Sequence, residues 1–501
     1  MLATLASATL TGVEGRSVTV EVHVADGLPG FSIVGLPDAS CREARDRVRA
    51  AIVSSGASWP LRRITVNLAP GGLPKAGAGL DLPIALGVLQ ASGQLPAELP
   101  SIGAFGELGL DGGIRPVPGA LPLADAVAGE LVLVPVVDAQ AATHVAGDRV
   151  RPVRTLADVV RAFVDGEPWP DPEPSFTDDA AVTFAPDLAD VRGQPAARAA
   201  LEVAAVGCHH LLLVGPPGAG KTMLARRLVG LLPRLSAAEA LEVSRVHSAA
   251  GLPLPPGGLV STPPFRAPHH SASMAALVGG ESGRARPGEV STATCGVLFL
   301  DELGEFAPSV LDALRQPLEE GVVRVARAGG TSVQPARVLV VAAMNPCPCG
   351  MGGELACRCP PAARARYARR VSGPLLDRLD LMVRVDRPDP AALLGPAGDS
   401  SAKVAERVAK VRQLSSARGV RCNADLTGDA LDEYAPLEPQ SATILERALV
   451  AGRLSGRGLR RVRCVARTIR DLDDAGPTLR PADVLAAIGF RARPLVEGSH
   501  G

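Results

Sequence analysis

The feature that most constrains this chain is an apolar run, 211–214, followed directly by GPPGAGKT at 215–222. Gly215, Gly220, Lys221 and Thr222 fall at the spacing of a P-loop, in which a buried strand turns through a glycine-rich loop into a helix. Successive backbone N–H groups of such a loop face phosphate oxygens, the lysine reaches the β and γ phosphates, and the hydroxyl ligates Mg²⁺. The pattern therefore predicts a site for ATP and Mg²⁺ at the end of a strand in an α/β sheet.

Two further apolar runs end in polar residues that suit the same site. Residues 297–300 lead into Asp301 and Glu302, where one carboxylate would hold the water shell of Mg²⁺ and the other would polarise the attacking water. Residues 338–344 lead into Asn345, a candidate sensor of the γ-phosphate, although an asparagine at a strand end is also a common turn former. We expect Lys221, Asp301, Glu302 and Asn345 to act in catalysis. The predicted nucleotide-binding residues are Gly215, Pro216, Pro217, Gly218, Ala219, Gly220, Lys221, Thr222 and Asp301, and the predicted Mg²⁺ ligands are Thr222 and Asp301.

A further arginine follows these motifs. In LLDRLD at 375–380, Arg378 stands between two aspartates. It is a candidate arginine finger, presented to the ATP of a neighbouring subunit. The alternative is a surface Asp–Arg pair, which contributes little to stability.

Charge and hydropathy exclude several classes of protein. The 52 basic and 52 acidic side chains cancel, so no global field would attract the chain to nucleic acid or to a membrane, and such binding must use local patches. The apolar runs are much shorter than the roughly 20 residues that cross a bilayer, and the N-terminus lacks the regions of a signal peptide. We therefore expect a cytoplasmic protein without a membrane partner. Lysine occurs at only four positions, so coding bias accounts for part of the abundant arginine, and arginine clusters carry less weight.

The order of patterns along the chain predicts three domains. A Pro-rich, acidic linker that cannot continue a helix or a central strand separates the first two. Beyond it, strands and helices alternate as in a parallel sheet covered by helices, and the last part carries helical periodicity typical of a lid. The predicted boundaries are 1–165 for a mixed α/β domain, 166–186 for the linker, 187–390 for the parallel-sheet core and 391–501 for the helical lid.

Individual elements are predicted within these domains. Residues 17–24 alternate as a half-buried strand, and Asp38 precedes a helical pattern at 39–55, as an N-cap does. The other predicted elements are strands at 64–68 and 131–135, helices at about 81–92 and 121–128, and lid helices at 402–414, 440–453, 459–474 and 481–489.

Taken together, the motifs closely resemble those of the YifB/ComM family of magnesium-chelatase-like AAA+ ATPases. The resemblance covers nearly the whole chain. The segments that carry it are GPPGAGKT, FRAPHHSAS (265–273), GVLFLDELGEF (296–306), LRQPLEEG (314–321), AAMNPCPCG (342–350), SGPLLDRLDL (372–381), GLPGFSIVGLPDAS (27–40), ITVNLAP (64–70), LDLPIALG (80–87) and RVRCVARTIRDL (461–472).

The resemblance implies a fold, an assembly and an activity. It implies an N-terminal Lon-protease-like domain, an AAA+ core, a magnesium-chelatase C-terminal-like lid, and a homo-oligomer, namely a hexameric ring. It also implies ATP hydrolysis coupled to helicase or branch-migration activity on single-stranded or branched DNA, in recombination or natural transformation. Arg467 matches the family's second sensor arginine, which contacts the γ-phosphate, but it lies in an arginine-rich run, 453–470, that a DNA-facing surface or coding bias would also explain.

The first domain lacks the residues of a Ser-Lys protease. Gly79 stands where the resembled Lon segment carries its serine, and Leu121 stands where it carries its lysine. A Ser-Lys dyad needs a hydroxyl and an amine that accepts its proton. We therefore expect no peptide cleavage.

Candidate contacts to DNA lie in two excursions from the core. The first, 251–289, resembles the insert that this AAA+ branch carries in its second helix, and it includes His269 and His270, for which a loop-capping role is favoured. The second, 321–337, reads as a hairpin with Arg324 and Arg327 near its tip. In a ring such hairpins would line the pore and grip phosphates without regard to sequence, whereas a solvated surface hairpin explains the arginines equally well.

Four cysteines crowd into a short segment that follows Asn345. Cys347, Cys349, Cys357 and Cys359 form two C-x-C pairs, and four thiolates so close together suit a tetrahedral Zn²⁺ site. Free or redox-active thiols are the alternative, because C-x₂-C is the more usual spacing for zinc. Arginines and one tyrosine at 364–370 follow directly, as in a DNA-contacting element.

Two further functions fit parts of the sequence. A magnesium-chelatase-type motor, driving metal insertion into a macrocycle or remodelling a protein partner, would share the P-loop and the carboxylate pair. ATP-dependent proteolysis would share the Lon-like domain. The cysteine segment and the Lon-like domain favour the DNA motor, because the resemblance associates both with the YifB/ComM branch rather than with chelatase subunits. Gly79 and Leu121 disfavour the protease.

Overall fold

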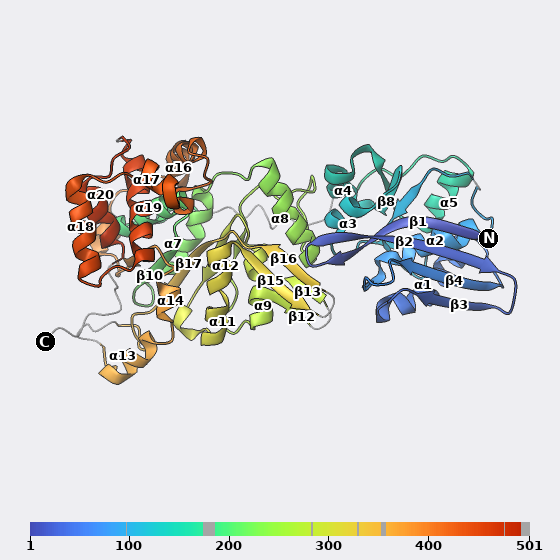
Figure 1. Ribbon diagram of the computed structural model, residues 1–501, viewed down its shortest axis with the longest axis horizontal. Coiled ribbons are helices and arrows are strands. Elements are labelled where there is room, and N and C mark those ends of the chain that lie inside the picture. The colour runs from blue at the N-terminus through green and yellow to red at the C-terminus, as the bar shows by residue number, and fades with distance from the viewer. Residues whose placement is uncertain are drawn as a thin grey trace.

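The computed structural model describes residues 1–96, 98–173, 186–281, 284–327, 330–351, 357–474 and 476–491. Figure 1 shows three regions along the long axis of the molecule, with the N-terminal sheet at one end, a second sheet in the middle and a helical region at the other end. No helix among the described residues is both long enough and apolar enough to span a bilayer. The mixed α/β architecture with a parallel-sheet core and a helical C-terminal region is the predicted one.

The N-terminal region is built on a seven-stranded sheet of order β3-β4-β2-β1-β5-β8-β9. The long hairpin β1–β2 and strand β4 pair antiparallel, while β3, β5, β8 and β9 join in parallel. The strands are β1 (Leu2–Thr11), β2 (Glu14–Ala25), β3 (Gly30–Val34), β4 (Arg63–Ala69), β5 (Ile102–Ala104), β8 (Leu131–Pro135) and β9 (Val150–Val153), with a short hairpin β6 (Glu107–Leu108) and β7 (Ile114–Arg115). The helices are α1 (Ala39–Ser54), α2 (Asp81–Ala91), α3 (Ala120–Ala126), α4 (Ala139–Ala146) and α5 (Leu156–Val164).

The local predictions for this region are confirmed. Val18, Val20, Val22 and Val24 on β2 are all buried, because alternate side chains of a strand point to the same face. Asp38 caps α1, and its carboxylate accepts a hydrogen bond from the backbone N–H of Cys41. The sequence pattern missed β1, which pairs along its whole length with β2.

The middle region carries a five-stranded parallel sheet of order β11-β14-β17-β10-β18. Its strands are β11 (Phe265–Arg266), β14 (Val297–Leu300), β17 (Leu339–Met344), β10 (Leu211–Val214) and β18 (Leu381–Arg384), and two hairpins lie outside it, β12 (Gly279–Glu281) with β13 (Arg284–Pro287) and β15 (Val322–Arg327) with β16 (Gly330–Pro335). The helices are α6 (Pro195–Gly207), α7 (Lys221–Leu228), α8 (Ala237–Ala250), α9 (Met274–Val278), α10 (Glu289–Thr292), α11 (Pro308–Ala313), α12 (Arg315–Glu320), α13 (Pro361–Ala368) and α14 (Gly373–Leu376).

The C-terminal region is helical throughout its described length. After α15 (Pro390–Leu394), it consists of α16 (Ser401–Ala417), α17 (Gly428–Tyr434), α18 (Pro439–Val450), α19 (Gly456–Leu472) and α20 (Pro481–Gly489). Each of the four predicted lid helices is present within a few residues of its expected bounds. Their apolar faces join those of α6, α7 and the core strands in one continuous cluster of buried residues.

The predicted domain boundaries remain proposals. The expected linker, 166–186, lies mostly outside the described residues. In the described structure α5 ends at Val164, and the next helix, α6, begins at Pro195.

Two regions meet at the interface between α3 and α8. Gly119 N–H donates to the carbonyl of Ser248 at 2.8 Å, and Arg245 forms an ion pair with Asp125 at 2.7 Å. An apolar cluster of Leu121, Ala141 and Leu254 closes the same interface. The N-terminal sheet is thus docked on the insert of the core, close to the hairpins.

Candidate functional site

The P-loop adopts the expected strand–loop–helix geometry. β10 ends at Val214, the loop follows, and α7 begins at Lys221. Gly215 lies against the neighbouring strand, and a Cβ there would stand 1.9 Å from the carbonyl oxygen of Val385, so only glycine fits. Gly218 and Gly220 both have positive φ, which lets the loop turn its N–H groups inward.

Lys221 and Asn345 are brought together at the edge of the sheet. The ammonium donates to the Oδ1 of Asn345 at 3.0 Å and to the carbonyls of Gly215 and Pro216 at 2.6 and 3.0 Å. Burial lowers the pKa of Lys221, although Asp301 and Glu302 act in the opposite direction. The side chain is therefore held in place beside Asn345, which directly follows β17.

The predicted Mg²⁺ ligands also meet. The Thr222 hydroxyl donates to the Oδ2 of Asp301 at 2.7 Å. Parallel register explains the convergence, since β10, β14 and β17 pair side by side and their carboxyl ends reach the same edge. A hydroxyl and a carboxylate are hard oxygen donors, so this pair fits Mg²⁺.

Glu302 stands in a strained backbone position next to this pair. Its φ is 51°, in the left-handed region that non-glycine residues rarely adopt. Such strain costs roughly 1–3 kcal/mol and clusters at functional sites. The half-exposed carboxylate projects from the turn, and its Oε2 lies 3.2 Å from the Nδ1 of His270.

His270 is a site residue that residue-by-residue reasoning missed. Its ring lies 4.1 Å from that of His269 and meets Phe306 edge-on. His269 itself bonds the hydroxyl of Ser271 at 2.7 Å, a loop-type contact that agrees with the role expected for it. The FRAPHHSAS motif was the available signal, but only the fold places one of its two histidines against Glu302.

Arg378 is engaged within its own chain. The side chain is 9% exposed, and its guanidinium pairs with Glu319 and donates to the carbonyls of Arg315 and Pro374 at 3.0 and 2.7 Å. The exposed Arg457, at the start of α19, approaches the other oxygen of Glu319 at 3.2 Å. The surface-pair alternative therefore does not describe Arg378, and a role as a finger requires exchange of Glu319 for a phosphate.

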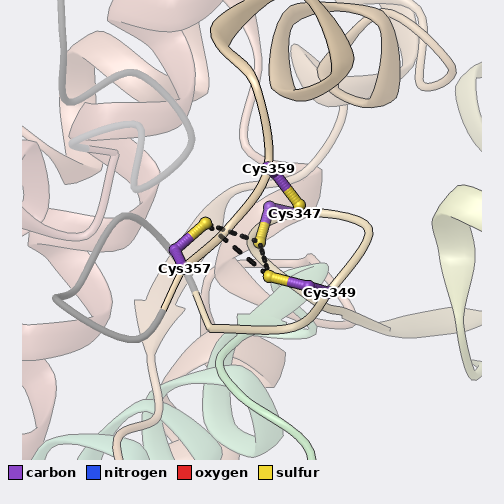
Figure 2. A group of neighbouring side chains, drawn as sticks. All are labelled: Cys347, Cys349, Cys357 and Cys359. Atoms are coloured by element: carbon purple, nitrogen blue, oxygen red, sulfur yellow. Dashed lines mark hydrogen bonds between the residues drawn. The ribbon is translucent and has the colours of Figure 1, made fainter.

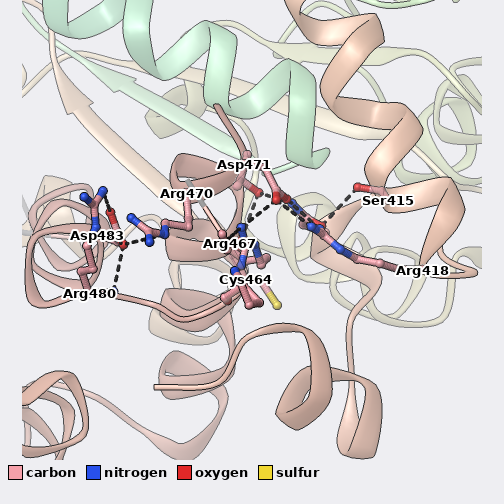
Figure 3. A network of polar contacts seen from close by, with 12 residues as sticks. Ser415, Arg418, Cys464, Arg467, Arg470, Asp471, Arg480 and Asp483 are labelled. Atoms are coloured by element: carbon pink, nitrogen blue, oxygen red, sulfur yellow. Dashed lines mark hydrogen bonds and ion pairs between the residues drawn. The ribbon is translucent and has the colours of Figure 1, made fainter. Parts of the chain in front are cut away.

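Arg467 lies in the helical region and not at the phosphate site. Figure 3 shows it in a polar network on α19, where it forms an ion pair with Asp471 at 2.8 Å and donates to the carbonyls of Gly476 and Pro477. Burial would raise the pKa of Asp471, but the hydrogen bond from Arg418 and the charge of Arg467 hold that pKa below its ordinary value.

The placement of α19 explains this difference from the expected contact with the γ-phosphate. Thr468 bonds His209, and Arg461 pairs with Asp380 at 2.8 Å, and both partners precede the amino ends of β10 and β18. The P-loop lies at the opposite end of these four-residue strands, about 13 Å away. Within one chain, this arrangement does not bring Arg467 to the phosphates.

The four cysteines that follow Asn345 converge. Figure 2 shows their sulfurs gathered at one point of the segment. The Sγ of Cys347 lies 3.4 Å from that of Cys349 and 3.7 Å from that of Cys357, and all four sulfurs, including that of Cys359, lie within 4.8 Å of one another. The sequence spacing thus folds into a compact thiol cluster.

The candidate DNA contacts have mixed outcomes. The hairpin β15–β16 is present, and Arg324 on it is exposed beside Glu320 at 3.2 Å. The side chain of Arg327 and the turn at 328–329 lie outside the described residues. Among the arginines that follow the cysteines, Arg366, Arg369 and Arg370 are exposed on or beside α13, whereas Tyr367 is buried.

Gly79 and Leu121, the two positions where protease residues are expected to be missing, lie in different surroundings. Gly79 lies in the turn before α2, where a Cβ would make ordinary contact with Val117. Leu121 is fully buried in the interface with Leu254. An apolar side chain at that position therefore serves packing between the two regions.

Comparisons with known proteins cover nearly the whole chain. The family model for subunit ChlI of Mg-chelatase matches residues 20–137, that for magnesium chelatase subunit ChlI matches residues 187–393, and that for its C-terminal part matches residues 398–491. A protein of Mycobacterium tuberculosis is 46% identical over 496 residues, which is 97% of each chain. Competence protein ComM of Haemophilus influenzae is 43% identical over 500 residues, 98% of this chain and 97% of the relative. YifB of Escherichia coli is 42% identical over 489 residues, 96% of this chain and 95% of the relative.

Proposed function

Since the chain belongs to the magnesium-chelatase-like AAA+ family that includes ComM and YifB, we propose that it hydrolyses ATP to drive a ring-shaped motor on DNA. The observation that carries the ATPase part is the meeting of Lys221, Thr222, Asp301 and Asn345 at the carboxyl edge of one parallel sheet. Four groups from three separate strand ends converge there, as binding of one triphosphate requires.

Each residue has a distinct task in the proposed reaction. Backbone N–H groups of 215–222 and the ammonium of Lys221 bind the phosphates, while Asn345 holds that ammonium toward the γ position. Mg²⁺, held by Thr222 and Asp301, would supply positive charge at the β and γ phosphates. Glu302 orients the attacking water and accepts its proton as the bond between the γ-phosphorus and the β–γ bridging oxygen breaks and ADP leaves. The left-handed turn at Glu302 aims the carboxylate out of the strand.

Assembly into a homohexamer supplies the remaining charge. The guanidinium of Arg378, which a carboxylate already holds in place, serves as the finger for the ATP of the next subunit. The exposed Arg457 also pairs with Glu319, so it would approach the ATP of the next subunit together with Arg378. The buried Arg467 then acts through Asp471 as part of the framework of α19, and a contact with phosphate requires a neighbouring subunit or a rearranged lid.

DNA is the proposed substrate of the motor, which would act in the cytoplasm in recombination or in transformation. The relative named a competence protein supports this choice. The hairpin β15–β16 with Arg324 and the arginines beside α13 offer cationic groups for backbone phosphates. Neither contact would depend on base sequence, which suits helicase or branch-migration activity.

The test compares ATP turnover without DNA and with single-stranded or branched DNA, for three proteins. The unaltered chain should be stimulated, Lys221→Ala should lose nucleotide binding, and Glu302→Gln should retain bound ATP without cleaving it. Normal hydrolysis by both variants would reject the site. If DNA does not stimulate ATP hydrolysis and the protein does not retain DNA, the DNA substrate is rejected and the ATPase proposal stands.

One observation favours a second function. All three family models that match the chain describe a magnesium chelatase subunit. A chelatase-type motor would remodel a protein partner that inserts a metal into a macrocycle. Stimulation of ATP turnover by such a partner, and not by DNA, would favour this alternative.

The cysteine cluster adds a metal to the proposal. Cys347, Cys349, Cys357 and Cys359 offer four soft sulfur donors in a small volume, as a structural Zn²⁺ requires. The N-terminal domain is proposed to lack protease activity, because Gly79 and Leu121 carry neither a nucleophile nor a base.

A further inference from the structure

The cysteine segment lies in direct contact with the P-loop. Gly350, three residues after Cys347, is buried, and its N–H donates to the carbonyl of Cys347 at 2.9 Å. A Cβ at Gly350 would stand 2.5 Å from the Cδ of Pro217, and φ at Gly350 is +82°. No side chain therefore fits between this segment and the P-loop.

The same segment reaches the carboxylate side of the site. Tyr367 on α13 is buried against Gly304, where a Cβ would stand 2.8 Å from the ring. Arg370 forms an ion pair with Glu305 at 2.9 Å. Both partners follow Glu302 by two or three residues. The described stretches 345–351 and 357–370 thus begin at Asn345, the proposed sensor, and touch both the P-loop and the turn that holds the proposed catalytic carboxylate.

The thiol geometry identifies the kind of metal. Four sulfurs around one tetrahedral Zn²⁺ at Zn–S distances near 2.3 Å stand about 3.8 Å apart. The sulfur–sulfur distances of 3.4, 3.6 and 3.7 Å among Cys347, Cys349 and Cys357 are close to that value. An iron–sulfur cluster would spread its thiolates further, because iron and sulfide atoms lie between them.

We propose that one Zn²⁺ bound by Cys347, Cys349, Cys357 and Cys359 clamps the described stretches 345–351 and 357–370 on the nucleotide site, so that metal occupancy sets the affinity for ATP. Binding forms four Zn–S bonds and releases the thiol protons to solvent. Cys347 is two residues from Asn345, so a fixed Cys347 fixes the sensor and, through it, Lys221. The inference rests on the proposed ATPase and adds a second ligand that controls it.

Thermodynamic linkage makes the proposal quantitative. If zinc tightens ATP binding by some factor, ATP must tighten zinc binding by the same factor. Coupling between two sites is typically in the range of roughly 5- to 150-fold. Both halves can be measured on the full-length protein without any assay of turnover.

The first experiment tests the metal. The purified chain should carry one zinc per subunit, and Co²⁺ added after zinc removal should give the strong visible absorption of a tetrahedral thiolate site. Cys349→Ser and Cys357→Ser should lose both signals. Cys41→Ser should keep them, since Cys41 is a buried thiol of the N-terminal domain whose Sγ donates to the carbonyls of Lys75 and Gly77. A chain with no bound zinc and no cobalt spectrum would overturn the metal site.

The second experiment tests the coupling. The dissociation constant of a fluorescent ATP analogue is measured with Mg²⁺ before and after zinc removal by TPEN, a chelator that leaves Mg²⁺ in place. It should rise by roughly 5- to 150-fold and recover when zinc is restored, in the unaltered chain and in Cys41→Ser. Zinc loss to the chelator should slow in the presence of the analogue. Equal affinity for the analogue with and without zinc would overturn the clamp.

A glycine variant separates ligation from contact. Gly350→Ala should weaken binding of the analogue while zinc stays at one per subunit, because the added methyl meets Pro217 and leaves the sulfurs alone. Gly373→Ala is the matched control, since a Cβ there meets nothing within 4 Å. Unchanged affinity in Gly350→Ala would overturn transmission through this contact. A chain that holds zinc and its cobalt spectrum but never binds the analogue would reject the ATPase, and with it the clamp.

Discussion

Two adjacent histidines at the proposed site have different surroundings. The Nδ1 of His270 lies 3.2 Å from the carboxylate of Glu302, whereas His269 bonds Ser271 within the loop. A ring in contact with a half-exposed carboxylate limits its rotation, and a carboxylate must be well aimed to activate water. His270 is therefore proposed to act as a positioning residue for Glu302.

This assignment predicts a difference between neighbouring substitutions. His270→Ala should lower kcat, by up to about 100-fold as misplacement of a catalytic group can, and leave the affinity for ATP nearly unchanged. His269→Ala should leave kcat within a factor of a few, because its partner is a loop hydroxyl. Steady-state turnover together with nucleotide titration checks both. Equal losses in the two variants would show that the loop as a whole, and not one contact, matters.

Burial also creates an isolated titrating group in the N-terminal region. The Oδ2 of Asp138 is buried and has no hydrogen-bond partner among the described residues, and burial raises the pKa of this carboxyl to about 7. In the unfolded chain the pKa is near its ordinary 3.8. The folded state therefore binds the proton more tightly, and stability contributed by this group is lost as the pH rises from about 4 to about 7.

Substitution of this carboxyl should remove that loss. Asp138→Asn should unfold at a higher temperature than the unaltered chain at pH 8, and this difference should be much smaller at pH 4.5. The amide cannot ionise, so its burial cost does not change with pH. Thermal unfolding followed at several pH values measures the difference. A constant offset between the two proteins across this range would contradict the raised pKa.

At the level of single residues, the sequence predicted groups whose position follows from local pattern. Lys221, Thr222, Asp301 and Asn345 each stand at the end of an apolar run, and parallel strands bring such ends together. The surroundings of Arg378 were not predictable in this way, because its partner Glu319 lies on α12, 59 residues earlier in the chain.

Helix α19 carries deeply buried charges. Asp471, with a side chain 1% exposed, accepts ion pairs from Arg418 and Arg467. Removing one partner of a buried pair leaves charge without compensation, which costs about 3–5 kcal/mol. Figure 3 shows that this network connects α16 to α19, so its loss would separate two helices.

We expect Asp471→Ala to destabilise the helical region by about that amount, whereas Lys410→Ala, which removes an exposed pair with Asp474, should cost less than about 1 kcal/mol. Denaturant unfolding followed by circular dichroism compares them. Since the pKa of Asp471 is lowered, its contribution is present above the ordinary pKa of an aspartate and disappears as the pH falls through the lowered value. Equal stability of the two variants at neutral pH would mean that this network does not hold α16 and α19 together.

At the level of elements, periodicity located the helices but not their arrangement. The pattern at 459–474 predicted α19, which spans Gly456–Leu472, because an apolar stripe at helical spacing is a local property. The same pattern cannot tell which end of the sheet the helix covers. That depends on contacts such as Thr468 with His209, 259 residues apart. For this reason the described structure does not bring Arg467 to the P-loop within one chain, and its contact with phosphate stays a prediction.

At the scale of the whole molecule, the N-terminal region contacts the ATPase core through α3, which packs on α8 and on the insert that follows it. Leu121 packs with Ala141 and Leu254, and its N–H bonds the hydroxyl of Ser248 at 3.2 Å. Sequence comparison with Lon presents Leu121 only as a missing lysine. In the structure, Leu121 joins the N-terminal region to the segment between the P-loop and Asp301.

Leu121→Lys, which restores the side chain of the resembled protease, should therefore undock the two regions and produce no peptidase. The lysine would place an unpaired ammonium in a fully buried site among apolar side chains, at a cost of several kcal/mol, and Gly79 would still offer no nucleophile. Leu121→Met keeps the volume and the apolar character, so it should cost less than about 1.5 kcal/mol. Calorimetry should show one shared transition in the Met variant and two separated transitions in the Lys variant, with faster proteolytic cleavage between the regions. If the Lys variant unfolds like the unaltered chain, the interface at Leu121 contributes nothing to stability. The N-terminal domain would then not be rigidly docked on the ATPase core.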